Sequence, residues 1–144
     1  IIMNKIKITF VVIITTVLFL NNSFADSNYF KDGEKLFNEK KYLKSKFQFE
    51  KDIVFNPKSE FSYLYLAKIF KQQDKDNLQE QNLNTVLLLN PKNEEAIFLL
   101  ALLKIEKSDF GEAEKLTKTF KKICKTICGK EAELENKLKN SQLN

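Results

Sequence analysis

Phe55-Asn56-Pro57-Lys58 recurs further along the chain as Leu89-Asn90-Pro91-Lys92. Proline has no amide hydrogen and biases the residue before it away from the helical conformation, so each Asn-Pro predicts that one helix ends and the next begins. The chain contains only 3 Gly and 2 Pro, and after residue 26 no stretch shows sustained alternation of apolar and polar residues. Because long strands joined by tight turns need both features, the sequence predicts an all-α fold.

The 34-residue spacing predicts a repeating unit that contains two helices. A single helix pair exposes an apolar stripe, and stacking on a neighbouring pair buries it. The expected first helices lie near residues 27–40, 60–73 and 94–107, and the expected second helices lie near residues 43–55, 77–89 and 110–123. A last, mostly polar helix is expected near residues 130–141, where it would cap the stack. An unrelated helical bundle is the alternative.

The residues at fixed positions of these units resemble the tetratricopeptide-repeat (TPR) family over about residues 28–124. These positions hold aromatic, aliphatic or small residues: Tyr29, Gly33, Leu36, Tyr42, Ser45 and Phe49, then Tyr63, Leu66, Ala67, Phe70 and Leu83, then Ile97, Leu100, Ala101 and Ala113. Residues 107–113 also resemble the family's inter-helix turn, with Asp109 as a helix cap. The resemblance implies a TPR-type α-α superhelix of three repeats, at about residues 26–59, 60–93 and 94–124, followed by a Cys pair and a capping helix in residues 125–144.

Five positions depart from the family's pattern. Ser45 and Gln79 replace Ala, Asp52 and Val86 occupy another small position, and Lys104 replaces an apolar residue. We expect these departures to change the packing locally and to leave the architecture unchanged.

The front of the chain has the order of a signal peptide. Lys5 and Lys7 precede an apolar run over residues 8–20, and Ser23 and Ala25 stand at the −3 and −1 positions of a cleavage site. This order predicts a signal peptide over residues 1–25, cleaved after Ala25, and an exported protein that resides in the periplasm. A secreted protein, or one anchored by an uncleaved N-terminus, is the alternative. As a helix, residues 6–20 would cover only about 22 Å of the roughly 30 Å hydrocarbon core.

The charge pattern disfavours nucleic acid as a partner. Removing residues 1–25 takes away two lysines and no acid, so the net charge falls from +5 to +3. Every basic residue is a lysine, and the lysines are interleaved with acids along the chain. Without arginine the chain lacks the planar group that recognises phosphates or guanine edges through two hydrogen bonds.

No motif for catalysis is present in the sequence. The chain has no His, which removes the usual general base near neutral pH and every Ser-His-Asp or Cys-His arrangement. The 3 glycines are isolated from one another, so there is no glycine-rich phosphate loop. The acids lie beside lysines at helical spacing, as solvated ion pairs do. We therefore predict a protein that is not an enzyme and that has no cofactor or metal.

Cys124 and Cys128 are the two cysteines of the chain. In an exported protein such a pair predicts a disulfide. Two Cα atoms four residues apart in a helix are about 6 Å from each other, near the upper end of disulfide geometry, so we expect the helix to end here with Gly129 as its terminator. The bond would replace the proline turn found at the equivalent place in the preceding unit. Free thiols or an active redox pair are the alternatives, whereas zinc would need further ligands.

The resemblance implies that the concave face of the first helices binds a protein or peptide. The predicted groove residues are Phe30, Glu34 and Phe37 in the first unit, Phe61, Leu64, Lys68 and Lys71 in the second, and Phe98, Leu102 and Ile105 in the third. Apolar groups around two lysines would suit an extended peptide or an amphipathic helix that carries apolar anchors and a carboxylate. The alternative for Phe37, Phe98, Leu102 and Ile105 is packing inside the fold.

The family's charged clamp for a C-terminal carboxylate is not matched. The corresponding positions hold Phe30, Glu34, Tyr65, Glu95 and Leu99, so a receptor for chaperone tails is not expected. The sequence predicts a non-catalytic scaffold or adaptor of the bacterial cell envelope. A self-assembly module is the first alternative, and a redox protein, which rests on the Cys pair alone, is the second.

Overall fold

The computed structural model describes residues 28–143, and the predicted signal peptide lies outside them. The described residues form seven α-helices and one short 3-10 helix: α2 (Tyr29–Asn38), α3 (Tyr42–Phe55), α4 (Glu60–Gln72), α5 (Asp76–Leu89), α6 (Glu94–Glu106), α7 (Phe110–Ile123), η1 (Cys128–Lys130) and α8 (Glu131–Gln142). The prediction of an all-α fold is therefore confirmed. None of the described helices has the length and apolar character that crossing a bilayer requires.

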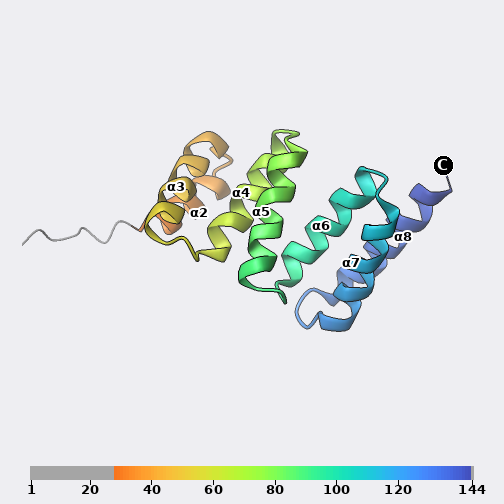
Figure 1. Cartoon of the computed structure of the whole chain (residues 1–144). Coiled ribbons are helices and arrows are strands. Elements are labelled where there is room, and N and C mark those ends of the chain that lie inside the picture. The colour runs from red at the N-terminus through yellow and green to blue at the C-terminus, as the bar shows by residue number, and fades with distance from the viewer. Residues whose placement is uncertain (1–27, 144) are drawn as a thin grey trace, which may run out of the picture.

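The helices pack as three successive antiparallel pairs, α2 with α3, α4 with α5 and α6 with α7. The second helix of each pair also contacts the first helix of the next pair, and α8 closes the far end of the stack against α6 and α7 (Figure 1). The predicted architecture of three helix pairs and a capping helix is confirmed.

The two Asn-Pro sequences lie between pairs, as predicted. The helix α3 ends at Phe55 and α4 begins at Glu60, and α5 ends at Leu89 before α6 begins at Glu94. The side chain of Asn93 caps α6 by accepting a hydrogen bond from the amide of Ala96 at 2.9 Å. A cap of this kind satisfies one of the amides that a helix start leaves without an intrahelical partner.

The turns inside the pairs recur with the same period. Lys40, Asp74 and Ser108 have φ angles of 57°, 53° and 58°, and they occupy the same position in the three successive pairs. In each turn the following amide donates to the carbonyl five residues before it, as Lys41 does to Leu36 at 2.9 Å. This hydrogen-bond pattern ends a helix with one left-handed residue, a place that glycine commonly takes. The three positions carry side chains here, so glycine content gave no signal for these turns.

The first pair is joined by a close contact at Gly33. A Cβ atom at this position would lie 2.8 Å from the nearest ring carbon of Phe49, whose side chain is fully buried. The hydroxyl of Ser45 donates to the Gly33 carbonyl at 2.8 Å. The expectation of a small residue at Gly33 is confirmed, and the departure from Ala at Ser45 is explained by this hydrogen bond between α2 and α3.

Lys104, another departure from the family's pattern, joins the second and third pairs. Its ammonium group lies 2.6 Å from Glu80 on α5 and 3.4 Å from Asp109 at the start of α7. Glu80 also pairs with Lys107 at 2.9 Å. Hydrogen bonds to Lys104 and Lys107 lower the pKa of Glu80, and the hydrogen bond to Glu80 raises the pKa of Lys104. The network holds α5 and α6 together where an apolar side chain was expected.

The core runs along the stack in three clusters. The first is centred on Phe49, Leu66, Ile69 and Phe70; the second on Leu64, Ala67, Leu83, Val86, Ala96, Leu100 and Leu103; the third on Ile97, Phe98, Ala101, Leu102, Ile105, Ala113, Phe120, Leu134 and Leu138. The last two of these residues belong to α8, so the capping helix completes the third cluster.

Candidate binding groove

The first helices of the three pairs, α2, α4 and α6, contact one another through their side chains. We call the surface that they form the A-helix face. Between α2 and α4 the contacts are aromatic, with the ring of Tyr65 centred 5.9 Å from Phe30 and 5.0 Å from Phe37. Both contacts are edge-on, as aromatic pairs favour. The predicted groove residues Phe30 and Phe37 are therefore half-buried and placed together by Tyr65, which the sequence reasoning did not select.

Tyr65 is also hydrogen-bonded across the two helices. Its hydroxyl donates to the carboxylate of Glu34 at 2.9 Å. Burial, reinforced by this hydrogen bond and by the negative charge of Glu34, raises the pKa of Tyr65 to about 12. Tyr65 therefore stays a neutral donor at physiological pH and fixes Glu34 at the edge of the A-helix face.

The two lysines predicted to bind a carboxylate already have acidic partners. Lys68 lies 2.7 Å from Glu95 on α6, and Lys71 lies 3.6 Å from Glu106 on the same helix. The Lys68 ammonium also lies 4.8 Å from the centre of the Tyr65 ring. These contacts hold α4 to α6. A ligand carboxylate would have to displace Glu95 or Glu106 from these lysines. The two lysines therefore serve mainly to hold α4 and α6 together, and less to bind a charged ligand.

An open site of mixed polarity lies at the end of the A-helix face near the inter-pair loops. Phe61 is 54% exposed, and its ring is centred 6.3 Å from that of Phe30. Beside Phe61 lies a hollow of about 320 Å³ that reaches the buried Leu64 and the half-buried Ile127, with Lys92 on its wall. The hollow brings together α4, the loop before α6 and the loop after α7. This is where the A-helix face can receive an apolar side chain.

The predicted groove residues of the third unit lie inside the core. Phe98, Leu102 and Ile105 are 5%, 4% and 5% exposed and share a cluster with Leu134 and Leu138 of α8. The capping helix therefore covers the part of α6 that was expected to line a groove. These three side chains are packed inside the fold, which was the alternative to a place in the groove. The open part of the A-helix face is confined to α2, α4 and the start of α6.

The loop after α7 is closed by the predicted disulfide. The helix α7 ends at Ile123, and Cys124 is bonded to Cys128 with their Cα atoms 5.3 Å apart. The expected helix break is confirmed, but Gly129 does not terminate α7, because it lies within the 3-10 helix η1. The chain has already left the helix at Cys124, so the bond needs no glycine at the helix end.

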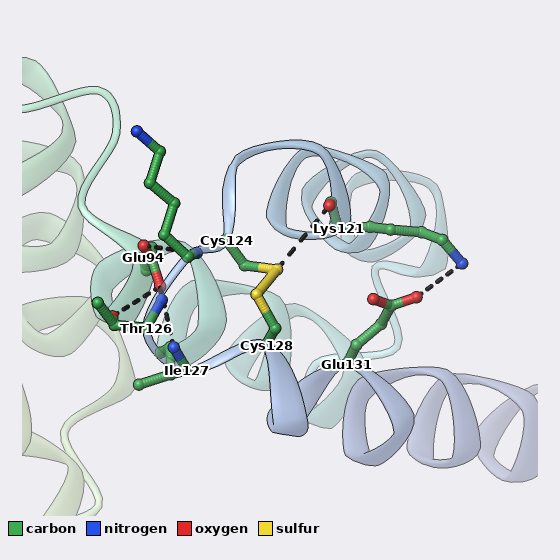
Figure 2. Close-up of a disulfide and its surroundings, with 8 residues drawn as sticks. Glu94, Lys121, Cys124, Thr126, Ile127, Cys128 and Glu131 are labelled. Carbon is green, nitrogen blue, oxygen red and sulfur yellow. Dashed lines mark hydrogen bonds and ion pairs between the residues drawn. A yellow bond between two sulfur atoms is a disulfide. The ribbon is translucent and has the colours of Figure 1, made fainter.

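The carboxylate of Glu94, at the start of α6, holds this loop from the inside. Figure 2 shows it pointing into the loop, where it accepts hydrogen bonds from the amides of Lys125 at 2.9 Å, Thr126 at 3.0 Å and Ile127 at 3.1 Å, and from the Thr126 hydroxyl at 2.9 Å. These bonds, the Thr126 amide first, lower the pKa of Glu94. The anchored loop places Ile127 on the wall of the hollow.

Glu94 is a residue that the sequence reasoning missed, although the repeat register contains a signal for it. Glu60 is its equivalent in the preceding unit, at the first position of α4, and accepts a hydrogen bond from the side chain of Asn90 in the next inter-pair loop at 3.2 Å. In both units an acid at the start of the first helix binds the loop that follows the second helix.

Within residues 28–143, no group of three or more His, Cys, Asp and Glu side chains is placed to hold a metal ion. The A-helix face combines exposed and half-buried aromatic side chains with internally paired charges and a small hollow of mixed polarity.

No described protein family and no curated protein matches the chain in sequence. Solved structures do match its fold. The TPR domain of P58(IPK) superposes with a TM-score of 0.75 at 22% identity, over 83% of this chain and 33% of that one. The translocator chaperone SycD of Yersinia enterocolitica type III secretion gives 0.72 at 15% identity, over 89% and 92% of the two chains. This chain therefore spans about a third of the P58(IPK) chain and nearly all of SycD.

A third match has a ligand. The first TPR of Spaghetti (RPAP3), bound to the HSP90 peptide SRMEEVD, gives a TM-score of 0.68 at 18% identity, over 78% of this chain and 86% of that one. At these identities the similarity concerns the fold, and the fold of residues 28–143 is TPR-like.

Proposed function

We propose that this chain is a non-catalytic scaffold of the bacterial cell envelope that holds a segment of another protein on its A-helix face. The observation that carries the proposal is the exposed Phe61 beside the hollow that reaches Leu64 and Ile127. Exposed aromatic side chains next to a preformed hollow that combines apolar and polar groups are common anchors of protein interfaces. Here Phe61, Leu64 and Ile127 supply the apolar part of the hollow. The TPR-like fold supports the same function, because such folds typically present this face to peptides and proteins.

The chemistry of the site favours an apolar anchor over a charged clamp. Lys68 and Lys71 are paired with Glu95 and Glu106, so their charges are already compensated. A partner segment would place a bulky apolar side chain in the hollow and lie across the rings of Phe30 and Phe61. The surrounding helices are fixed by ion pairs and ring contacts, so binding would order little of the protein and cost little conformational entropy.

The envelope location rests on the predicted signal peptide and on the disulfide. Disulfides persist in oxidising compartments such as the periplasm, and Cys124 and Cys128 are bonded here. The N-terminal sequence of the protein isolated from cells tests this part. A mature chain that starts at Asp26 is expected, whereas a chain that retains residues 3–25 would contradict the predicted cleavage.

Recovery of the partner from the envelope fraction tests the site. A tagged chain with Phe61→Ser should recover a specific partner at least about tenfold less well than the wild type, as expected for the loss of an interface anchor. The matched control is Leu88→Ser, because Leu88 is 83% exposed on α5, away from the hollow. Equal recovery by Phe61→Ser and wild type, or an equal loss in both variants, would refute the assignment of the site.

A further inference from the structure

The outward face of α3 carries a second apolar surface, separate from the A-helix face. Leu43, Phe47 and Val54 are 77%, 55% and 73% exposed. At about 100° per residue these three positions fall within a narrow arc of the helix, and at 1.5 Å per residue they span roughly 16 Å. We call them the α3 stripe. Three large apolar side chains exposed on one face of a single helix form a candidate interaction surface.

The α3 stripe is specific to the first helix pair. The equivalent positions of the second and third pairs hold Asn77, Gln81 and Leu88 on α5, and Gly111, Lys115 and Lys122 on α7. All six are exposed, although a helix pair precedes each of those helices. Another pair of the same kind in front of α2 would therefore leave the stripe uncovered. The stripe is not the missing contact of a longer stack.

Lysines border the stripe along its length. The ammonium group of Lys51 lies 4.3 Å from the centre of the Phe47 ring and 5.3 Å from that of Tyr29. Lys40 and Lys44 lie with Leu43 around a shallow hollow at the start of α3. Within residues 28–143, neither of these two lysines has an acidic partner. One border of the stripe is thus cationic, and the other carries the Lys46–Glu50 ion pair.

The acids of this region do not offset those lysines. Glu39 pairs with Lys41 at 2.7 Å, and Glu50 pairs with Lys46 within α3. Asp52 accepts a hydrogen bond from Ser62. Residues 39–54 carry five lysines and three acids, so the net charge beside the stripe is positive.

We propose that the α3 stripe docks the protein on an anionic lipid surface. Leucine, valine and phenylalanine side chains enter the boundary between headgroups and acyl chains, while the bordering lysines contact lipid phosphates, as in other interfacial helices. A second copy of this chain fits less well, because it would bring the same lysines face to face. An acidic helix would need a groove between elements, and the stripe is the crest of one helix.

Docking through α3 would leave the partner site free. The stripe lies on a second helix of a pair, whereas Phe61 and the hollow lie on the face of the first helices. The protein would therefore lie on a membrane through its first pair and hold its partner on α4 and α6.

Tryptophan fluorescence of the full chain tests the proposal, because the chain has no Trp of its own. Phe47→Trp places a reporter in the stripe, and Leu88→Trp places the matched reporter at an exposed position of α5. Each variant is mixed with vesicles of phosphatidylcholine alone or of phosphatidylcholine with phosphatidylglycerol, with and without brominated acyl chains. Both variants carry the same N-terminal residues, so any membrane contact made by those residues contributes equally.

With anionic vesicles we expect the emission of Phe47→Trp to shift to shorter wavelength and to be quenched by brominated lipid, while Leu88→Trp shows neither change. Adding Lys44→Gln and Lys51→Gln should weaken the binding of Phe47→Trp roughly tenfold or more, since each lysine near an anionic surface contributes several-fold. Equal quenching of the two reporters, or no quenching of either, would overturn the proposal. A blue shift that needs no lipid and grows with protein concentration would assign the stripe to a second copy and overturn it as well.

Discussion

Replacing Gly33 with alanine tests the close packing on which the first helix pair depends. The new Cβ atom would lie 2.8, 2.9 and 3.0 Å from three ring carbons of Phe49, whereas carbon atoms in good contact are about 3.5–4.0 Å apart. The Phe49 ring has no room to retreat, because it is fully buried and stacked on Tyr65 with ring centres 4.8 Å apart. Overpacking of this kind costs up to about 3 kcal/mol, and the higher helix propensity of alanine returns about 1 kcal/mol. We expect Gly33→Ala to lower the free energy of unfolding by about 2 kcal/mol.

Gly111 provides a control of opposite sign. It is also helical, but nothing lies within 4 Å of a Cβ atom placed there. Gly111 lies in the first turn of α7, where helix propensity counts for less than at the interior position of Gly33. Gly111→Ala should therefore raise the free energy of unfolding by about 0.5 kcal/mol. Urea denaturation of the oxidised protein, followed by far-ultraviolet circular dichroism, measures both changes as shifts of the midpoint at constant slope. A Gly33→Ala variant as stable as the wild type would refute the reasoning, since it would mean that α2 and α3 do not approach as closely as described.

Three further outcomes are expected. Burial, and then the hydrogen bond to Glu34, raises the pKa of Tyr65 to about 12. The contribution of the neutral Tyr65 to stability is therefore complete below about pH 10 and is lost as the pH rises through 12. The free energy of unfolding measured across this range should depend less on pH for Tyr65→Phe than for the wild type. The Cys124–Cys128 bond spans a sequence separation of only 4, so its reduction should lower the free energy of unfolding by at most about 2 kcal/mol, and a larger loss in urea denaturation would contradict the loop-entropy account. Lys40 is exposed with a φ of 57°, so Lys40→Gly should raise the free energy of unfolding by about 0.5 kcal/mol and the thermal midpoint with it. A lower midpoint would exclude left-handed strain at this position.

The fold could be predicted in detail because short sequence motifs mark each end of its repeating unit. The Asn-Pro sequences end α3 and α5, and the expected helix limits near 60–73 and 94–107 differ from Glu60–Gln72 and Glu94–Glu106 by a single residue. The left-handed turn residues were not foreseen. Their positions hold Lys40, Asp74 and Ser108 in place of glycine, so composition gave no indication of the conformation.

The candidate site could be predicted only in part, because the repeat register describes the interior of a stack better than its end. The register places Phe98 and Leu102 on the A-helix face, but it does not say that α8 packs against them. It also placed Lys68 in a groove without showing that Glu95 lies 2.7 Å away on the next helix. Both facts depend on contacts between units. The sequence therefore does not predict the neighbours of those side chains that a single repeat unit would expose.

The most direct test of the partner site is photo-crosslinking inside the envelope. A photoreactive phenylalanine analogue is introduced in place of Phe61, on the A-helix face, or in place of the exposed Leu88 on α5. A discrete adduct with another protein is predicted from position 61, and none with that protein from position 88. The same adduct from position 88 alone, or no adduct from position 61 in cells that contain the partner recovered by the wild type, would contradict the claim that this protein works by holding another protein on its first helices.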